Sequence, residues 1–421
     1  MSLRAAFARL AGAAALSQLI PMAAAPLLTR WYGAEALGHW ALFAALAANL
    51  ATVANARYEY AIVLPRRKGE AALLLQLSLW VALGVAGLSL VGMLLLQLLP
   101  QLPARLSPAV LALGPWWLAL PMLVGLAGVQ QALTLWNNRA GRYDAIASAR
   151  VLQQGAAALA QLIAPLLLAA SAGALVAGQL LGALLAPLWL LRRGTVMARR
   201  RPAPAAFLVR LARRYRQFPL VNSPHAFVNA LQETLVIGLI ATLAGAAEAG
   251  YYAVMVRLVK APASLVGGAL SELLLGRLAR GWQAGEDLRP VLRRLLVRLA
   301  LVALLPLALL LLAGPALFGW ALGPEWARAG EYARWLAPYV AVHFVAAPLT
   351  VTPMVTGRQG GALVFSLVGN AIYVLAVAAV LGGGGGLGPA LGLISLAMPL
   401  FFAVYLGWLL RGAAPGRRAA T

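Results

Sequence analysis

The sequence contains no cysteine and few acidic residues: its 421 residues include 34 Lys and Arg but only 11 Asp and Glu. Without cysteine, the chain has no disulfide framework and no thiolate ligands for a metal. It also shows no Walker A motif, no zinc-ligand spacing and no Ser/His/Asp constellation with supporting loops. We therefore expect no cofactor, no metal, no direct use of ATP and no enzymatic activity.

The residues that are present indicate an integral membrane protein. Hydrophobic residues make up 62% of the chain and the mean hydropathy is +0.84, which lies outside the range of soluble domains. About 20 apolar residues are needed to cross the hydrocarbon core of a bilayer. On that criterion the sequence predicts an all-α fold of twelve transmembrane helices, near residues 10–28, 36–56, 72–99, 109–136, 148–170, 174–191, 218–244, 249–276, 299–321, 333–356, 362–382 and 388–410.

The net charge of +23 does not indicate a nucleic-acid partner, because the basic residues form no single patch. They punctuate the apolar runs instead, as in polytopic membrane proteins. With the N-terminus placed in the cytoplasm, 28 Lys and Arg fall in inner segments and four in outer loops. This asymmetry predicts a multi-pass topology with both termini in the cytoplasm. A signal peptide is the alternative for the first run, but Pro21 interrupts it.

A short internal repeat divides the chain into two halves. Shifted by 212 residues, the string GAEALGHWA that begins at Gly33 falls on GAAEAGYYA, which begins at Gly245. Both strings lie at the predicted outer turn between the first and second helix of a six-helix half. We therefore predict a six-helix lobe at 1–191, a basic cytoplasmic linker at 192–217 and a second lobe at 218–421, related by a pseudo-two-fold axis along the membrane normal.

Two cations lie within the eighth predicted span, in the segment GYYAVMVRLVKAP that begins at Gly250. Arg257 and Lys260 are three residues apart, so both lie on one helix face, about one turn from each other. Each costs about 2.5–3.5 kcal/mol at the centre of a bilayer. Charged groups retained at that cost predict a binding site for an anion. The alternative for Arg257 is that its side chain snorkels to the outer interface.

The seventh predicted span carries a polar stripe at similar depth. Its members recur at intervals of three, four and four residues, which places them on one face of a helix: Asn222, His225, Asn229 and Glu233. Gln232 borders the stripe. We predict that Asn229 and Gln232 contact substrate hydroxyl groups. Glu233, the only acid well inside a span, is the candidate for ion coupling, and the alternative is that it pairs with Lys260 or Arg257. The alternative for the other polar groups of the stripe is that they bond neighbouring helices together.

Several motifs occur in an order that resembles the Wzx-type polysaccharide flippases. At the end of the second predicted span comes the string NARYEYAIVLP, residues 55–65, after a glycine-bounded outer turn. Further similar motifs follow along nearly the whole chain: Asn138-Arg139 with Arg142-Tyr143, Ala147 to Arg150, Tyr215 with Phe218-Pro219, Pro224 and Asn229, Gly250 to Ala253 with Pro262, and Gly323 with Trp326 and Ala329-Gly330. Each motif is loose, and their order carries the resemblance.

The resemblance implies a MATE-like fold of two six-helix lobes, within the multidrug/oligosaccharidyl-lipid/polysaccharide exporter (MOP) superfamily. It also implies a place in the bacterial inner membrane and alternating-access transport of undecaprenyl-diphosphate-linked oligosaccharides, as in O-antigen and lipopolysaccharide biosynthesis. The implied partners are this lipid-linked glycan, membrane lipids, and the glycan polymerase and chain-length machinery.

The residues and the resemblance agree on an anionic substrate, which gives Arg257 and Lys260 the role of binding phosphates or acidic sugars. On this interpretation Asn229, Gln232 and His225 complete the substrate site. One alternative is a drug or small-cation extruder of the same fold, for which an acidic cleft would be expected. A membrane-embedded glycan polymerase or ligase is a further alternative, disfavoured because no outer loop is long enough for its acceptor site. Ion coupling is thinly supported, since Glu233 stands nearly alone.

Overall fold

The computed structural model describes residues 3–98, 114–167, 169–193 and 204–414, which are helical with short connections. The chain packs into two compact units, Met1–Gly250 and Tyr251–Thr421. Unit 1 contains the elements α1 (Leu3–Trp31), α2 (Ala34–Ala51), η1 (Tyr58–Val63), α3 (Lys68–Leu98), η2 (Gly114–Leu118), α6 (Ala119–Arg139), α7 (Tyr143–Leu167), α8 (Ala172–Arg193), α9 (Ala205–Arg214), η3 (Phe218–Asn222) and α10 (Ser223–Leu243).

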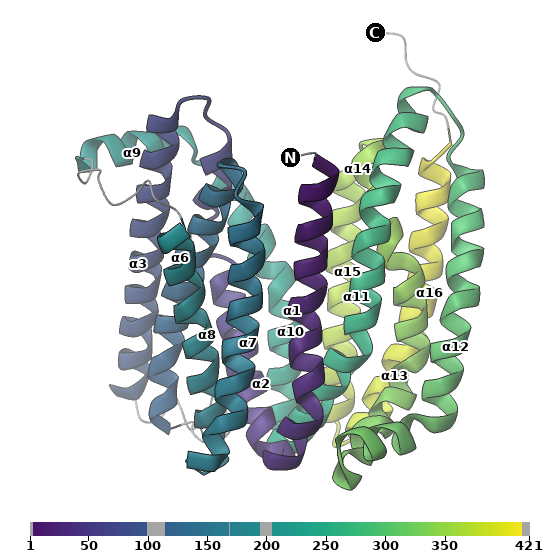
Figure 1. Cartoon of the computed structure of the whole chain (residues 1–421). Coiled ribbons are helices and arrows are strands. Elements are labelled where there is room, and N and C mark those ends of the chain that lie inside the picture. The colour runs from purple at the N-terminus through teal and green to yellow at the C-terminus, as the bar shows by residue number, and fades with distance from the viewer. Residues whose placement is uncertain (1–2, 99–113, 168, 194–203, 415–421) are drawn as a thin grey trace. The chain divides into compact units, whose positions relative to one another are not determined.

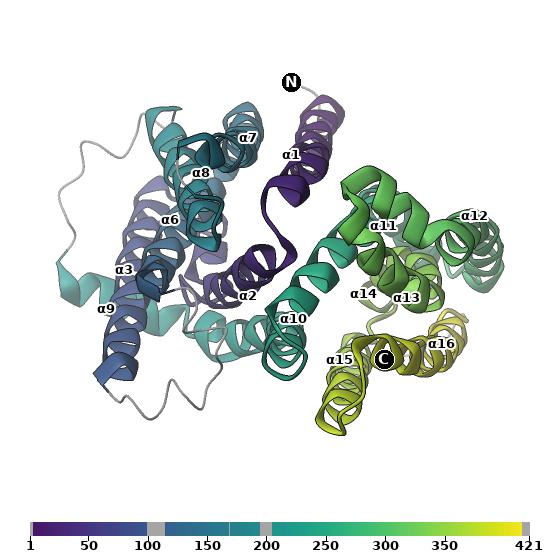
Figure 2. The same cartoon turned by 90° about the horizontal axis from the view of Figure 1, so that it is seen from below.

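Unit 2 begins within α11 (Ala246–Gln283) and holds the helices that follow it. They are α12 (Arg289–Leu322), η4 (Pro324–Trp326), α13 (Ala327–Ala346), η5 (Ala347–Val351), α14 (Thr352–Thr356), α15 (Gln359–Gly382) and α16 (Leu387–Gly412). Figure 1 shows the long helices of each unit running nearly side by side, and Figure 2 shows the same bundles end on. The all-α prediction is confirmed, and each predicted span overlaps a helix of the described residues.

Nine helices of the described residues are long and apolar enough to cross a membrane. The remaining predicted spans correspond to α2, α7 and α11, which are helical but shorter or more polar. In α11 the polar residues include the two predicted anion-binding cations. The number of twelve crossings therefore stays a prediction.

The outward faces of these helices carry exposed apolar side chains. On α12, Leu305, Leu312 and Trp320 are each more than three-quarters exposed. Exposed apolar surface of this extent is typical of a lipid-facing helix and not of a soluble monomer. The chain is therefore a multi-pass membrane protein.

The repeated glycine turns meet inside unit 1. The helices α2 and α11 begin at Ala34 and Ala246, which are one repeat apart. A Cβ atom on Gly38 would overlap the Ala246 carbonyl, and a Cβ on Gly250 would overlap the Ala34 carbonyl. In the repeat, Gly38 corresponds to Gly250 and Ala34 to Ala246. The missing side chain of each glycine therefore lets the starts of the two helices approach closely. The contact is reciprocal, as a two-fold axis requires, and it supports the predicted repeat.

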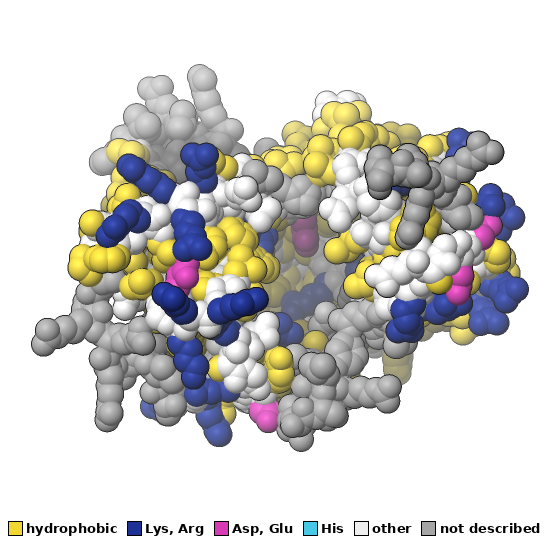
Figure 3. Space-filling model, turned by 90° about the horizontal axis from the view of Figure 1, so that it is seen from above, with side chains coloured by type: hydrophobic (Ala, Val, Ile, Leu, Met, Phe, Trp, Pro, Cys, Tyr) yellow, Lys and Arg dark blue, Asp and Glu magenta, His cyan; other side chains and the backbone are white. Residues whose placement is uncertain are grey.

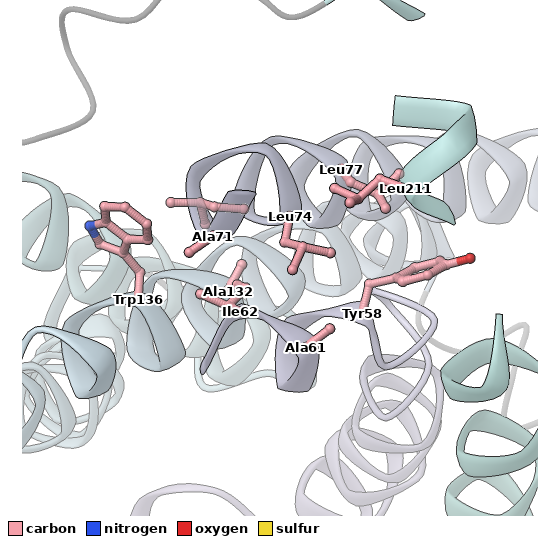
Figure 4. Packing of buried hydrophobic residues seen from close by; sticks show 10 residues of the cluster. Tyr58, Ala61, Ile62, Ala71, Leu74, Leu77, Ala132, Trp136 and Leu211 are labelled. Atoms are coloured by element: carbon pink, nitrogen blue, oxygen red, sulfur yellow. The ribbon is translucent and has the colours of Figure 1, made fainter. Parts of the chain in front are cut away.

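The predicted linker contains a helix that the sequence interpretation did not include. In Figure 1, α9 lies across the helix ends of unit 1. Its Leu211 packs into a buried cluster with Tyr58, Ile62, Leu74 and residues of α6 (Figure 4). Additional bonds hold α9 in place: Tyr58 Oη donates to the Ala212 carbonyl at 3.1 Å, and Arg214 pairs with Glu70 at 3.0 Å. Residues 194–203 of the linker lie outside the described part.

Basic side chains gather at one end of each unit. Figure 3, viewed from above, shows basic side chains on this face of the molecule. In unit 1, Arg66 and Arg67 precede α3 and Lys68 is its first residue, and all three are exposed. In unit 2 the end of α11 and the start of α12 carry the exposed Arg277, Arg280, Arg289, Arg293 and Arg294. Lys and Arg are enriched on the cytoplasmic side of membrane proteins, so we assign the predicted cytoplasmic side to these ends.

The units do not coincide with the predicted lobes. The unit boundary falls at Gly250, because α10 and the first turn of α11 pack against α2. The lobes are defined by the sequence repeat and the units by packing density. The lobe boundaries at 192–217 accordingly stay a prediction.

Candidate functional site

The cation pair lies on α11, within unit 2. Arg257 and Lys260 lie in a run of apolar residues, and in a membrane such a run satisfies its backbone polar groups as a helix. Arg257 is exposed, whereas Lys260 is half-buried. The Lys260 Nζ atom lies 5.9 Å from the centre of the Tyr339 ring, on α13. That distance is within the range of a cation–π contact, so the ammonium lies against the negative face of an aromatic ring.

Tyr339 belongs to a connected group of aromatic side chains in unit 2. Its ring centre lies 5.6 Å from that of His343, one turn along α13, and 5.4 Å from that of Tyr373 on α15. The Tyr373 hydroxyl is 2.9 Å from the Tyr252 hydroxyl on α11. Phe402 of α16 completes the group, with its ring centre 6.0 Å from that of His343. These contacts connect α11, α13, α15 and α16, and Tyr339 joins the group to Lys260.

Sequence reasoning did not include Tyr339, His343 or Phe402 among the site residues. The spacing of Tyr339 and His343, four residues apart on a helix, was the available signal. Their partners come from distant parts of the chain, which a one-dimensional pattern does not reveal. Together with Lys260 they combine a cation with the buried ring of Tyr339 and the half-buried rings of His343 and Phe402. A cation beside aromatic rings suits a phosphate attached to a sugar.

The polar stripe lies on α10, within unit 1. Two hydrogen bonds fix α10 against α2: Asn49 Nδ2 donates to the Phe227 carbonyl at 3.2 Å, and Thr234 Oγ1 donates to the Ala45 carbonyl at 3.1 Å. These bonds set the rotation of α10 about its axis. The opposite face of the helix is thereby left to the stripe.

The stripe is accessible along only part of the helix. Asn229 and Glu233 are exposed and Gln232 is half-buried. Ile237 and Ile240, one and two turns further on the same face, are buried. On this face, the polar side chains are thus accessible and the apolar side chains further along the helix are buried. Asn222 is also exposed, whereas the side chain of His225 lies outside the described part.

The structure therefore brings the predicted residues together in two sets. Asn229, Gln232 and Glu233 share a helix in unit 1, and Arg257 and Lys260 share a helix in unit 2. Each set has the mutual placement that its spacing predicted. A single substrate site built from both sets stays a prediction.

Comparison with solved structures identifies the fold. An inward-facing multidrug resistance MATE family transporter of the MOP superfamily aligns over 98% of this chain and 96% of its own, at 14% identity and a TM-score of 0.63. A MOP superfamily transporter from Pyrococcus furiosus, described as having a binding pocket of reverse polarity, aligns over 97% and 95%, at 14% identity and a TM-score of 0.61. A MATE protein in a bent conformation gives a TM-score of 0.55. The fold is that of the MATE transporters.

A family model then narrows the assignment. The model described as polysaccharide biosynthesis protein matches residues 77–331, which is more than half of the chain. The chain belongs to this polysaccharide biosynthesis family. Family and fold together confirm the resemblance to Wzx-type flippases and make the protein a membrane transporter. No protein of curated function matches the chain.

Proposed function

We propose that this protein flips undecaprenyl-diphosphate-linked oligosaccharide units across the bacterial inner membrane by alternating access. The headgroup enters from the cytoplasm, where both termini lie, and the polyprenyl tail remains in the lipid. Arg257 and Lys260 neutralise the diphosphate or acidic sugars. Asn229, Gln232 and His225 bind hydroxyl groups, and Glu233 exchanges the coupling ion.

The observation that carries the proposal is the setting of Lys260. A lysine in the apolar part of a membrane protein is costly unless it serves a charged ligand or partner. Here Lys260 is half-buried against Tyr339, and its helix also carries Arg257 one turn away. A pair of fixed cations attracts a dianion such as a diphosphate far better than it does a cationic drug. Membership of the polysaccharide biosynthesis family supports a glycan as the remainder of the substrate.

Substitution of the two cations tests the proposal. We expect Lys260→Ala and Arg257→Ala each to abolish export of the glycan in a strain that lacks its own flippase, with unchanged protein abundance in the membrane. Lys260→Arg retains the charge and should preserve part of the export. Arg280→Ala, an exposed arginine of the same helix outside the predicted span, is the matched control and should export normally.

The outcomes separate the candidate functions. Full export by the double variant Arg257→Ala/Lys260→Ala would remove the cation pair from the mechanism. Resistance to cationic dyes that depends on Glu233, with no effect on glycan export, would instead favour a cation extruder. Export by Glu233→Gln that keeps its dependence on the ion gradient would exclude Glu233 as the coupling group.

A further inference from the structure

The NARYEYAIVLP segment contains an unusual backbone. Between α2 and η1, Ala56 and Arg57 adopt positive φ angles of 46° and 62°, and they are the two non-glycine residues of the described chain that do so. Left-handed backbone at a non-glycine residue is unfavourable by about 1 kcal/mol or more and persists only where the surroundings enforce it. Residues in such conformations cluster at active sites, ligand clamps and switch regions.

Contacts on both sides hold η1 in place. Ile62 and Ala61 are fully buried against α3 and α6 (Figure 4). The Arg139 guanidinium of α6 donates to the Ile62 carbonyl at 3.2 Å and to the Val63 carbonyl at 3.3 Å. At the other end, Tyr58 bonds the connector helix α9. Any movement of η1 would therefore change its contacts with α6 and with α9.

Glu59 lies in the middle of this clamped turn. Its side chain is only 2% exposed, and its Oε2 atom has no hydrogen-bond partner among the described residues. A buried carboxylate with an unpaired oxygen is disfavoured relative to the neutral acid. Burial accordingly raises the pKa of Glu59 to about 7, against smaller lowering effects of a backbone hydrogen bond and of the Arg57 charge.

The charged groups of the neighbouring elements are engaged elsewhere. On α3, Glu70 accepts hydrogen bonds from Arg214 and Tyr215, and Lys68 is exposed. On α6, Arg139 is bonded to backbone carbonyls. The turn η3, which also packs on η1, carries no titratable side chain. Arg57 is the charge that acts on Glu59, and its own guanidinium donates to Tyr60 Oη at 3.0 Å.

We propose that Glu59 is a proton-binding switch at the inner end of α2. The carboxyl group is neutral while η1 lies against α3 and α6. Transfer of its proton to water leaves a carboxylate that cannot remain buried, so η1 moves out to hydrate it. The strained residues Ala56 and Arg57 form the hinge of this movement, and the bond from Tyr58 carries it to α9.

The absence of native cysteine allows a direct test on the full-length protein in lipid nanodiscs. Ile62→Cys places a thiol at a fully buried position of η1, and Leu64→Cys places one at a position that is 58% exposed. The ratio of maleimide labelling at the two positions cancels the intrinsic pH dependence of the reagent. We expect this ratio to rise by up to tenfold per pH unit between about pH 5 and 7 and to level off above that range.

Two substitutions, each combined with the cysteine variants, test whether the pH dependence of the labelling ratio comes from Glu59. In Glu59→Gln, a neutral side chain of the same shape, the ratio should stay at its low-pH value throughout. In Glu70→Gln, the matched carboxylate of α3, the rise should persist. A flat ratio without either background substitution overturns the proposal, and so does an unchanged rise in Glu59→Gln.

An infrared titration of the cysteine-free chain gives a second, independent measurement. Only 11 acidic residues contribute to the carboxyl region of the spectrum. We expect one neutral carboxyl band that persists at pH 6 and is lost near pH 7. Complete ionisation of all carboxyl groups by pH 6 would contradict the proposal even if the cysteine variants failed to fold.

Discussion

The reciprocal glycine contact makes a quantitative prediction for Gly38→Ala and Gly250→Ala. A Cβ atom on Gly38 would lie 2.7 Å from the Ala246 carbonyl carbon and 2.9 Å from the Gly250 nitrogen, besides overlapping the Ala246 oxygen. Carbon atoms in contact lie about 3.5–4.0 Å apart. The starts of α2 and α11 must therefore separate by roughly 1 Å. Overpacking of this kind costs about 1–3 kcal/mol.

The double variant provides a sharper test than either single one. The separation that accommodates a methyl group at Gly38 also accommodates one at Gly250, because each glycine contacts the other's helix start. We therefore expect the double variant to lose clearly less stability than the sum of the two single losses. Independent sites would give additive losses.

The assay is the apparent unfolding midpoint in detergent, followed through the 12 tryptophans. Gly155→Ala is the matched control, because a Cβ at Gly155 would have no atom within 4 Å and alanine favours the interior of a helix. It should leave stability unchanged or slightly raised. Unchanged stability in both Gly38→Ala and Gly250→Ala would refute the close contact, and strictly additive losses would refute the shared separation.

Three further predictions concern single side chains. Arg139→Ala removes the donors to the η1 carbonyls, so it should cost about 1–3 kcal/mol of stability and raise the labelling of Ile62→Cys at low pH. Tyr252→Phe removes the 2.9 Å hydroxyl pair with Tyr373 and should lower stability by about 1 kcal/mol, whereas protein abundance should be retained. The pKa of Glu59 rises from 4.5 to about 7 on folding, so the folded chain holds a proton that the unfolded chain loses. Stability relative to Glu59→Gln should therefore fall as pH rises from about 4.5 to 7, by at most roughly 3 kcal/mol, and a rise over that range would contradict the sign.

The sequence predicted the helices well because apolar runs of membrane length have few other structures available. The glycine turns also predicted correctly that α2 and α11 begin at equivalent positions. Spacing alone placed Arg257 and Lys260 together on one helix, and likewise Asn229 and Glu233. The successes for side chains all concern neighbours within one helix.

The features that were missed depend on contacts between distant segments or on short helices. Tyr339 lies against Lys260, and Tyr373 against Tyr339, only because residues of α11, α13 and α15 meet in the fold. The helix α9 is ten residues long and lies within a run of arginines, which obscured its apolar side. Leu208, Leu211 and Ala212, at spacings of three and four residues, were the signal for it. Glu59 was read as part of a motif, and its burial followed only from the fold.

The glycine contact also bears on the origin of the chain. Gly38 and Gly250 occupy equivalent positions in the repeat. Gly38 approaches the Ala246 carbonyl and Gly250 approaches the Ala34 carbonyl, and these two carbonyls are also equivalent. In a symmetric dimer, a surface that contacts its own copy is isologous and needs no second, complementary surface. On the predicted division into two six-helix lobes, this is the surface that an ancestral six-helix protein would use to pair with a second copy of itself. Fusion of two such genes would preserve that interface within one chain.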